Sequence, residues 1–312
     1  MKNQKLPVSS ENVITPLQKR CRELLSLSIR IGAILFIFSV FSGCSVNRLA
    51  VGQMGGLMKD GFPAYMKETD PELVRDAMPA NLKLIESLLE IDPDNQTLLM
   101  LACQGFSAYA FMFIEENDPT RAKKLYQRAK KYGFAMLKQR GLIPDNIYDL
   151  DAWDKILSHA GKDDVPAIFW TAFAWGGKIQ LDRESPFSLA DIPFVIRLAE
   201  QTATLDPAYW FAGPDTFLGF YHGNVPKPIG GKPELSKQHF EKALKLTGRN
   251  FLMVQVLYAR SYAIQVQDRN LYNALLSEVI DSSKDVLPKA ALSNAIARQK
   301  AKQLMKQSDD FF

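Results

Sequence analysis

The sequence is poor in the residue types that build most metal and redox centres. It has three cysteines and three histidines in 312 residues, at Cys21, Cys44, Cys103, His159, His222 and His239. No two histidines stand four residues apart, and no two cysteines have the spacing of a zinc site. The sequence therefore predicts no metal site and no cofactor.

Motifs that mark catalytic loops are also missing. Gly105–Tyr109 (GFSAY) lacks the second glycine of a nucleophile elbow and lies in a helical pattern, whereas that elbow requires a strand-to-helix turn. Gly52–Gly56 (GQMGG) follows no strand, so it is neither a dinucleotide fingerprint nor a phosphate loop. We predict a protein that is not an enzyme; a hydrolase acting through Asp206 or His222 is the weakest alternative.

The body of the chain has no excess of charge. The formal net charge is +4, but six basic and only two acidic residues precede Cys44, so residues 44–312 are formally neutral. A neutral body lacks the counterion release that holds proteins on nucleic acid. We therefore expect no nucleic-acid partner.

The N-terminal apolar run is too short to be a permanent membrane span. Ile31–Phe41 contains 11 uncharged residues, whereas a spanning helix needs about 20. Basic residues precede this run and the small residues Ser42 and Gly43 follow it, which is the layout of a secretory signal. The sequence predicts a signal peptide over residues 1–43, with an uncleaved anchor as an alternative.

The end of this signal resembles a bacterial lipobox, in which the cysteine is lipidated and becomes the new N-terminus. The residues are Phe41-Ser42-Gly43-Cys44. We predict lipidation at Cys44 and a tether over residues 44–69; a soluble secretion signal is the alternative. Acyl chains hold a protein at a membrane surface without a spanning helix. Ser45 after the cysteine favours the outer membrane, on its periplasmic side.

After Cys44 the apolar residues recur with the helical period, and strand-type alternation is almost absent. The sequence therefore predicts an all-α domain over residues 70–312. The expected helices are Asp70–Ile91, Gln96–Glu116, Thr120–Lys138, Asp145–His159, Pro166–Leu181, Ile192–Leu205, Asp215–His222, Pro233–Leu246, Asn250–Gln267, Asn270–Ser282 and Pro288–Gln307.

Two sequence patterns recur 114 residues apart. Leu89–Pro93 (LEIDP) is matched by Ala203–Pro207 (ATLDP), and Ala122/Tyr126/Ala129 by Ser236/Phe240/Ala243. The second pair has the small–aromatic–small spacing of a tetratricopeptide (TPR) second helix. We predict an irregular TPR-like solenoid of four or five helical hairpins. An unrelated helical bundle is the alternative, because Asp-Pro is a common helix stop.

Aromatic residues are concentrated between Ala167 and Tyr221. This segment holds 12 of the 33 aromatic residues and three of the four tryptophans. Such a density either fills the interior of a solenoid or lines an apolar cleft. We predict a ligand-binding cleft or pore formed by Phe169, Trp170, Phe173, Trp175, Tyr209, Trp210, Phe217 and Tyr221.

The order of motifs from the lipobox to about Ile280 resembles the T-component family of lipoproteins associated with tripartite ATP-independent periplasmic (TRAP) transporters. The motifs are Ile168–Gly176, Leu205–Gly213, Phe217–Tyr221, Pro228–Lys232, His239–Leu244, Leu257–Ala259 and Gln267–Asp268. The resemblance implies a periplasmic TPR-type trimer with an apolar pore through each subunit. It also implies that a solute-binding protein of the transporter is its partner. At Asp215 the chain departs from the family pattern, where a less charged residue is expected.

These observations predict an accessory lipoprotein of a TRAP-type transporter. Its cleft would bind an apolar or amphipathic organic acid, and its concave surface a solute-binding protein. The alternative is a general cell-envelope scaffold that binds peptides or cell-wall machinery.

Overall fold

The computed structural model describes residues 20, 25, 46–225 and 231–312. It divides the chain into two units, Met1–Ala50 and Val51–Phe312, and every element discussed below belongs to the second. Apart from residues 20 and 25, the predicted signal peptide lies outside the described residues. So do Cys44 and residues 226–230, which include part of the Pro228–Lys232 motif.

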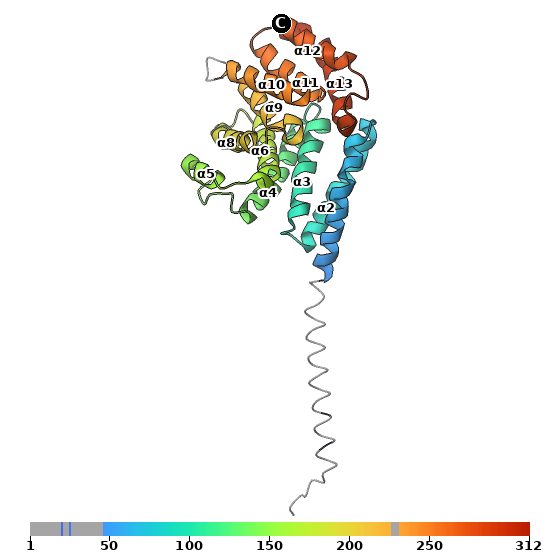
Figure 1. Cartoon of the computed structure of the whole chain (residues 1–312), viewed down its shortest axis with the longest axis vertical. Helices are drawn as coiled ribbons and strands as arrows, with labels where there is room; N and C mark the ends of the chain where they lie inside the picture. The colour runs from blue at the N-terminus through green and yellow to red at the C-terminus, as the bar shows by residue number, and fades with distance from the viewer. Residues whose placement is uncertain (1–19, 21–24, 26–45, 226–230) are drawn as a thin grey trace, which may run out of the picture. The chain divides into compact units, whose positions relative to one another are not determined.

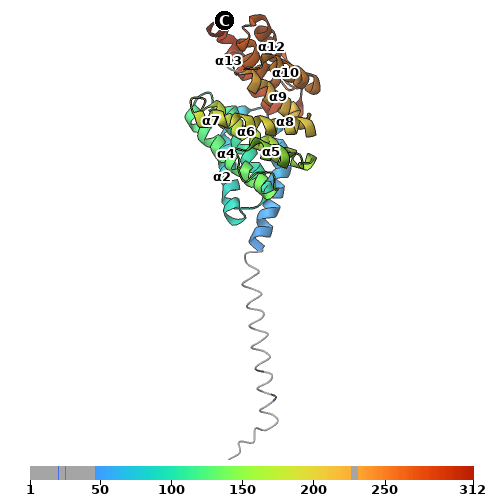
Figure 2. The same cartoon turned by 90° about the vertical axis from the view of Figure 1, so that its left-hand side faces the viewer.

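The described residues form helices and contain no strand, which confirms the predicted all-α class (Figure 1). In Figures 1 and 2 the C-terminal helices α10, α12 and α13 lie together in both views. The elements are α2 Pro71–Ile91, α3 Gln96–Tyr109, η1 Ala110–Ile114, α4 Pro119–Gln139, α5 Leu150–Leu157, η2 Lys162–Asp164, α6 Val165–Gln180, α7 Pro186–Ala190, α8 Ile192–Leu205, α9 Tyr209–Gly223, α10 Pro233–Thr247, α11 Met253–Tyr258, η4 Ala259–Ala263, α12 Arg269–Asp281, η5 Pro288–Ala290, α13 Ala291–Lys306 and α14 Ser308–Phe311.

Aspartate side chains begin several of these helices. Asp70 accepts a hydrogen bond from the Glu72 backbone N–H at 3.0 Å, and Asp118 accepts one from Arg121 at 2.9 Å. Each caps backbone donors that have no partner within the helix, and in both helices proline follows at the first position. The Asp-Pro signals at these two sites therefore start helices.

The LEIDP and ATLDP motifs form equivalent helix ends. The Asp92 backbone N–H donates to the Leu88 carbonyl at 3.0 Å at the end of α2. The Asp206 N–H donates to the Thr202 carbonyl at 2.9 Å at the end of α8. Since the two ends share the same geometry, the recurrence in sequence corresponds to a recurrence in local structure.

Many helices pack against their neighbours in sequence, as hairpins do, and α6 also packs against α3, α4 and α8. Contacts join α2 to α3, α3 to α4, α8 to α9 and α9 to α10. However, α13 also contacts α2, and the Lys300 ammonium donates to Glu116 from the C-terminal to the N-terminal part of the unit. An open stack of repeats touches only adjacent repeats, so the TPR-like solenoid stays a prediction.

Two helical stretches differ from the sequence analysis. Residues 51–67, expected to be part of the tether, are helical. Helix α9 begins at Tyr209, six residues before the expected start, and contains a left-handed turn.

The continuous apolar stretch Gln96–Ile114 has the length and composition of a membrane span, but two thirds of its most apolar window is buried within the unit.

Glycines bring α4 and α6 into close contact. A Cβ atom on Gly133 of α4 would lie 2.5 Å from the Thr171 Oγ1 atom of α6 and 3.1 Å from its Cα. A Cβ on Gly177 of α6 would lie 2.5 Å from the Tyr126 ring of α4. Each helix therefore makes room for a side chain of the other, and together they carry Tyr126 and the aromatic residues of α6.

We expect Gly133→Ala to lower the free energy of unfolding by about 1–3 kcal/mol, because the added methyl group meets Thr171 backbone as well as its side chain. The matched control is Gly56→Ala, whose Cβ meets nothing within 4 Å. This control should raise stability by up to about 1 kcal/mol through helix propensity. Chemical denaturation measures both, and equal effects of the two substitutions would contradict the packing argument.

Candidate functional site

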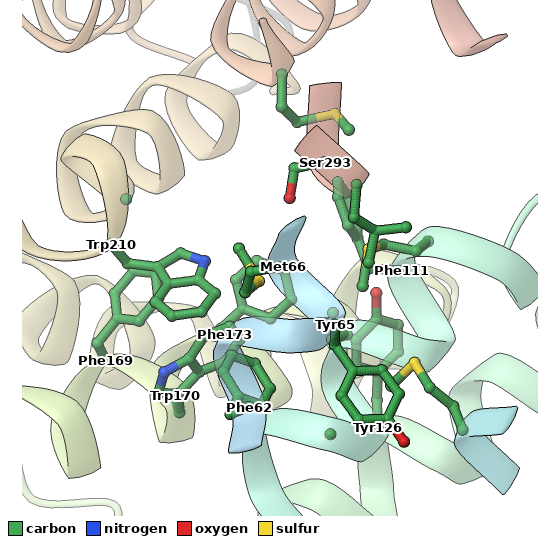
Figure 3. A pocket seen from close by; sticks show the side chains of 18 of the residues that line it. Phe62, Tyr65, Met66, Phe111, Tyr126, Phe169, Trp170, Phe173, Trp210 and Ser293 are labelled. Carbon is green, nitrogen blue, oxygen red and sulfur yellow. The ribbon is translucent and has the colours of Figure 1, made fainter. Parts of the chain in front are cut away.

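The unit Val51–Phe312 contains a partly open apolar cavity of about 370 Å³, here called the aromatic cavity. Its walls come from the helical residues 51–67 and from α2, α3, η1, α4, α6, α9, α11 and α13. Figure 3 shows Phe169, Trp170 and Trp210 grouped on one side of the view, and Tyr65, Phe111 and Tyr126 on the other. A space of this size with a mostly apolar wall suits a small apolar or amphipathic ligand.

Six of the eight aromatic residues predicted to bind a ligand line this cavity. They are Phe169, Trp170, Phe173, Trp210, Phe217 and Tyr221. Tyr209 does not line it, but its hydroxyl accepts a hydrogen bond at 3.2 Å from the indole N–H of Trp170. Burial raises the pKa of Tyr209 to about 12, so the hydroxyl stays protonated. Tyr209 thus supports the cavity through its hydrogen bond to Trp170, without lining the cavity itself.

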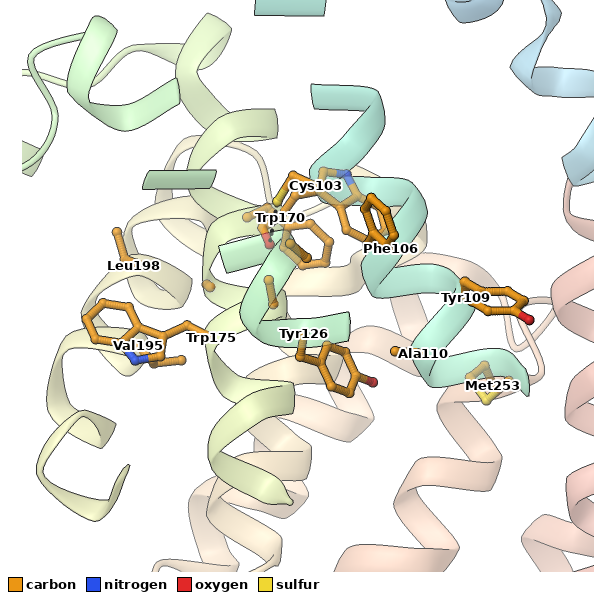
Figure 4. Packing of buried hydrophobic residues seen from close by; sticks show 14 of the residues in the cluster. Cys103, Phe106, Tyr109, Ala110, Tyr126, Trp170, Trp175, Val195, Leu198 and Met253 are labelled. Atoms are coloured by element: carbon orange, nitrogen blue, oxygen red, sulfur yellow. Dashed lines mark hydrogen bonds between the residues drawn. The ribbon is translucent and has the colours of Figure 1, made fainter. Parts of the chain in front are cut away.

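Trp175 lies in the core, away from the cavity. Its ring stacks on Phe194 at a centroid distance of 6.2 Å, and its indole N–H donates to the Asp191 carboxylate at 2.6 Å. The Lys130 ammonium lies 4.0 Å from the centre of the same ring, and burial lowers the pKa of Lys130 to about 8. Figure 4 shows Trp175 beside Val195, separate from Trp170.

A left-handed turn positions Trp210. Trp210, Phe211 and Ala212 have φ angles of 47°, 58° and 58°, a conformation that costs L-residues about 1–2 kcal/mol each. Phe211 stacks on Phe251 at 4.6 Å, and the Trp210 ring meets Trp170 edge-on at 4.9 Å. These ring contacts hold the turn and direct the Trp210 indole into the cavity wall.

The helical residues 51–67 supply a wall that the sequence analysis missed. Met58, Phe62, Tyr65 and Met66 line the cavity, and the Tyr65 hydroxyl accepts a hydrogen bond from the Asn81 side chain of α2. The spacing of these residues follows the helical period. That spacing was the signal that could have identified this segment as part of the folded unit.

Two π-helical turns meet at a charged cluster on the cavity wall. Glu115, which lines the cavity, follows directly after η1, and Arg260 lies within η4. The Glu115 carboxylate accepts a hydrogen bond from the Tyr126 hydroxyl at 2.8 Å and lies 3.6 Å from the Arg260 guanidinium. Burial raises the pKa of the Glu115 carboxyl, and it also raises the pKa of Tyr126. Such π turns are often found at functional sites.

Asp215 does not line the cavity. It is fully buried, and its carboxylate lies 2.8 Å from the His239 Nδ1 atom and 2.9 Å from the Lys242 ammonium. His222 stacks on His239 at 5.9 Å, and burial is the main cause that lowers the pKa of His222. Asp215, where we expected a departure from the family pattern, thus forms an ion pair with Lys242 between α9 and α10.

Neither alternative catalytic residue lies in the cavity wall. The Asp206 carboxylate lies 3.8 Å from the Lys162 ammonium, and neither Asp206 nor His222 lines the cavity. Among the described residues, no group of three or more His, Cys, Asp and Glu side chains is placed to hold a metal ion.

Comparison with known proteins gives two findings. A family model described as the TRAP transporter T-component matches residues 67–312, which confirms the resemblance seen in the sequence. An uncharacterized protein of Treponema pallidum (strain Nichols) is 21% identical over 305 residues, covering 87% of this chain and 94% of the relative. The family match begins at the end of the helical residues 51–67, so most of that cavity wall precedes it.

The raised pKa of Glu115 predicts a pH-dependent effect of Glu115→Gln. The folded state binds the Glu115 proton more tightly than the unfolded state does. Below the ordinary pKa of glutamate, protonated Glu115 therefore makes its whole contribution to the free energy of unfolding. This contribution is lost as the pH rises through the raised pKa of the folded state. Glutamine has no such loss. We therefore expect the stability of Glu115→Gln relative to the parent protein to increase as the pH rises from the ordinary glutamate pKa of about 4.5 through the raised value.

Thermal unfolding across this pH range measures the effect. The quantity compared is the pH dependence, because the Arg260 contact forms only with the ionised carboxylate and its effect is already part of the net rise in the pKa of Glu115. Glu184→Gln, at an exposed position, removes the same charge and serves as the control. A relative stability of Glu115→Gln that stays constant or falls with rising pH would show that burial of this carboxyl is not costly.

Proposed function

Because the chain belongs to the TRAP transporter T-component family, we propose that it is a non-enzymatic accessory component of such a transporter that holds an apolar or amphipathic ligand in the aromatic cavity. The observation that carries the ligand-binding part is the cavity itself, about 370 Å³ in volume, with Trp170, Trp210 and Phe173 in its wall. Aromatic rings of this kind bind apolar groups over a large area, while a few polar groups orient the ligand.

The polar groups of the wall favour binding over catalysis. The Glu115 carboxylate is engaged by Tyr126 and Arg260, so neither oxygen is placed as an unhindered base. The Trp170 indole N–H is engaged by Tyr209. These contacts fix the wall in one arrangement, which suits a protein that releases its ligand unchanged.

The proposed location is the periplasm, with lipid on Cys44 holding the protein to a membrane, of which the outer membrane is favoured. Support comes from the short apolar run, the lipobox-like residues and the family's role in transport. The proposed partner is the solute-binding protein of the same transporter. Assembly into a homotrimer is part of the proposal because the family resemblance implies it.

We expect the chain to form a complex with the solute-binding protein of its own transporter. Purified proteins mixed at micromolar concentrations should co-elute and cross-link, and a solute-binding protein from an unrelated transporter is the control. Elution of the two partners as separate species, with no cross-linked product, would overturn the docking part of the proposal.

Filling part of the cavity should weaken ligand binding. Ala108 of α3 lines the cavity and is partly exposed, so Ala108→Phe places a ring in the space that a ligand would occupy. We expect this variant to lower the affinity for N-phenylnaphthylamine, an uncharged apolar probe that fluoresces when bound, by at least about tenfold.

The control is Ala203→Phe, an equal change at a partly exposed position of α8 that does not line the cavity. Unfolding midpoints of both variants show whether the fold is kept. Equal probe affinity in the parent protein and in a folded Ala108→Phe variant would place the probe outside the aromatic cavity.

A further inference from the structure

A second hollow lies against the aromatic cavity. It is a surface recess whose lining includes Phe62, Met66, Trp210, Lys67 and Lys289, here called the lysine recess. Phe62, Met66 and Trp210 line both hollows, so these three side chains form the partition between them. Figure 3 labels Phe62, Met66 and Trp210 among the side chains that line the aromatic cavity. A ligand that displaced or passed these side chains would extend from the recess into the cavity.

The lysine recess carries positive charge only. Lys67 and Lys289 are exposed, and no aspartate or glutamate lines the recess. Within residues 46–225 and 231–312, neither ammonium forms an ion pair with a carboxylate. The Lys289 ammonium lies 5.5 Å from the centre of the Phe211 ring, in the left-handed turn beside the partition.

The aromatic cavity, in contrast, has almost no charged residues in its wall. Among the described residues that line it, Glu115 is the only member of the Asp, Glu, Lys and Arg group. The three basic residues between Ala167 and Tyr221 do not line the cavity. Lys178 pairs with Asp182, Arg197 with Asp154, and Arg183 donates to the Asn224 carbonyl. A carboxylate inside the cavity would therefore lose its hydration, and the Arg260 guanidinium beside the wall is already paired with Glu115 and Glu116.

We propose that Lys67 and Lys289 form a head-group site for a long-chain carboxylate, whose hydrocarbon chain passes the partition of Phe62, Met66 and Trp210 into the aromatic cavity. This inference rests on the proposed ligand-binding function and specifies its substrate class and orientation. The charged head stays hydrated beside two cations, while the chain is removed from water among aromatic rings. The opposite orientation would bury the head beside Glu115.

The test compares a carboxylate with an uncharged ligand of the same chain length. Decanoate and decanol compete with N-phenylnaphthylamine on the full chain. The variant is the double substitution Lys67→Glu and Lys289→Glu, at exposed positions. The control is Lys124→Glu with Lys131→Glu, which changes the net charge equally at exposed positions of α4 that line neither hollow.

We expect the recess variant to bind decanoate about tenfold more weakly and decanol within about twofold of the parent protein, because exposed charge pairs contribute modestly. The control should bind both as the parent does. Added salt should weaken decanoate binding in the parent protein and leave decanol binding nearly unchanged.

Two results would overturn the head-group site while leaving the cavity function intact. One is unchanged decanoate affinity in the recess variant, and the other is an equal loss for decanoate and decanol. Failure of the parent protein to bind decanoate, decanol and the fluorescent probe would overturn the ligand-binding function and the head-group site together.

Discussion

The left-handed turn at Trp210, Phe211 and Ala212 is the constraint on which the binding region depends. Three consecutive L-residues in this conformation cost about 3–6 kcal/mol in total. Full burial of an aromatic side chain contributes about 1.5–3 kcal/mol, of which the partly buried Trp210 and Phe211 each gain a share. An aromatic pair adds about 0.5–1.5 kcal/mol. The stacking of Phe211 on Phe251 and the edge contact of Trp210 with Trp170 are therefore of the right size to offset the strain. A regular helix here would point the Trp210 ring in another direction, and the partition between the two hollows would be lost.

The sequence predicted most helices and failed where tertiary contacts decide the backbone. Asp70 and Asp118 are followed by proline and mark helix starts through local hydrogen bonds, so a sequence pattern identifies them. The π-helical turns at Ala110–Ile114 and Ala259–Ala263 have no comparable local signal, because one extra residue in a turn is accommodated by packing. The helical residues 51–67 were missed for a different reason: their methionines and aromatics have helical spacing, but proximity to the lipobox suggested a tether.

The candidate site was predicted by residue type, and helical geometry explains what that approach missed. At about 100° per residue, Phe169, Phe173 and Gln180 of α6 share one face, and all three line the cavity. Trp175 lies about 160° from Phe173 around the same helix, and it packs into the core against Phe194. A helical projection of α6 would therefore have separated Trp175 from Trp170. The charged group on the wall, Glu115, could not be found in this way. Its position depends on η1 and on the distant residues Tyr126 and Arg260.

Family membership and the proposed ligand preference rest on different parts of this chain. The family match begins at residue 67 and includes the α6 and α9 aromatics, so the tryptophan side of the cavity belongs to the shared domain. Phe62 and Met66, two of the three partition residues, precede the match, and Lys67 is its first residue. An apolar wall accepts many hydrocarbon chains, because apolar contacts discriminate weakly between ligands of similar size. Discrimination between charged and uncharged ligands requires polar groups at fixed positions. In this chain such groups lie at two places, Glu115 on the wall and the two lysines of the recess, so a second T-component with the same aromatic residues but different charges at these positions would select a different class of ligand.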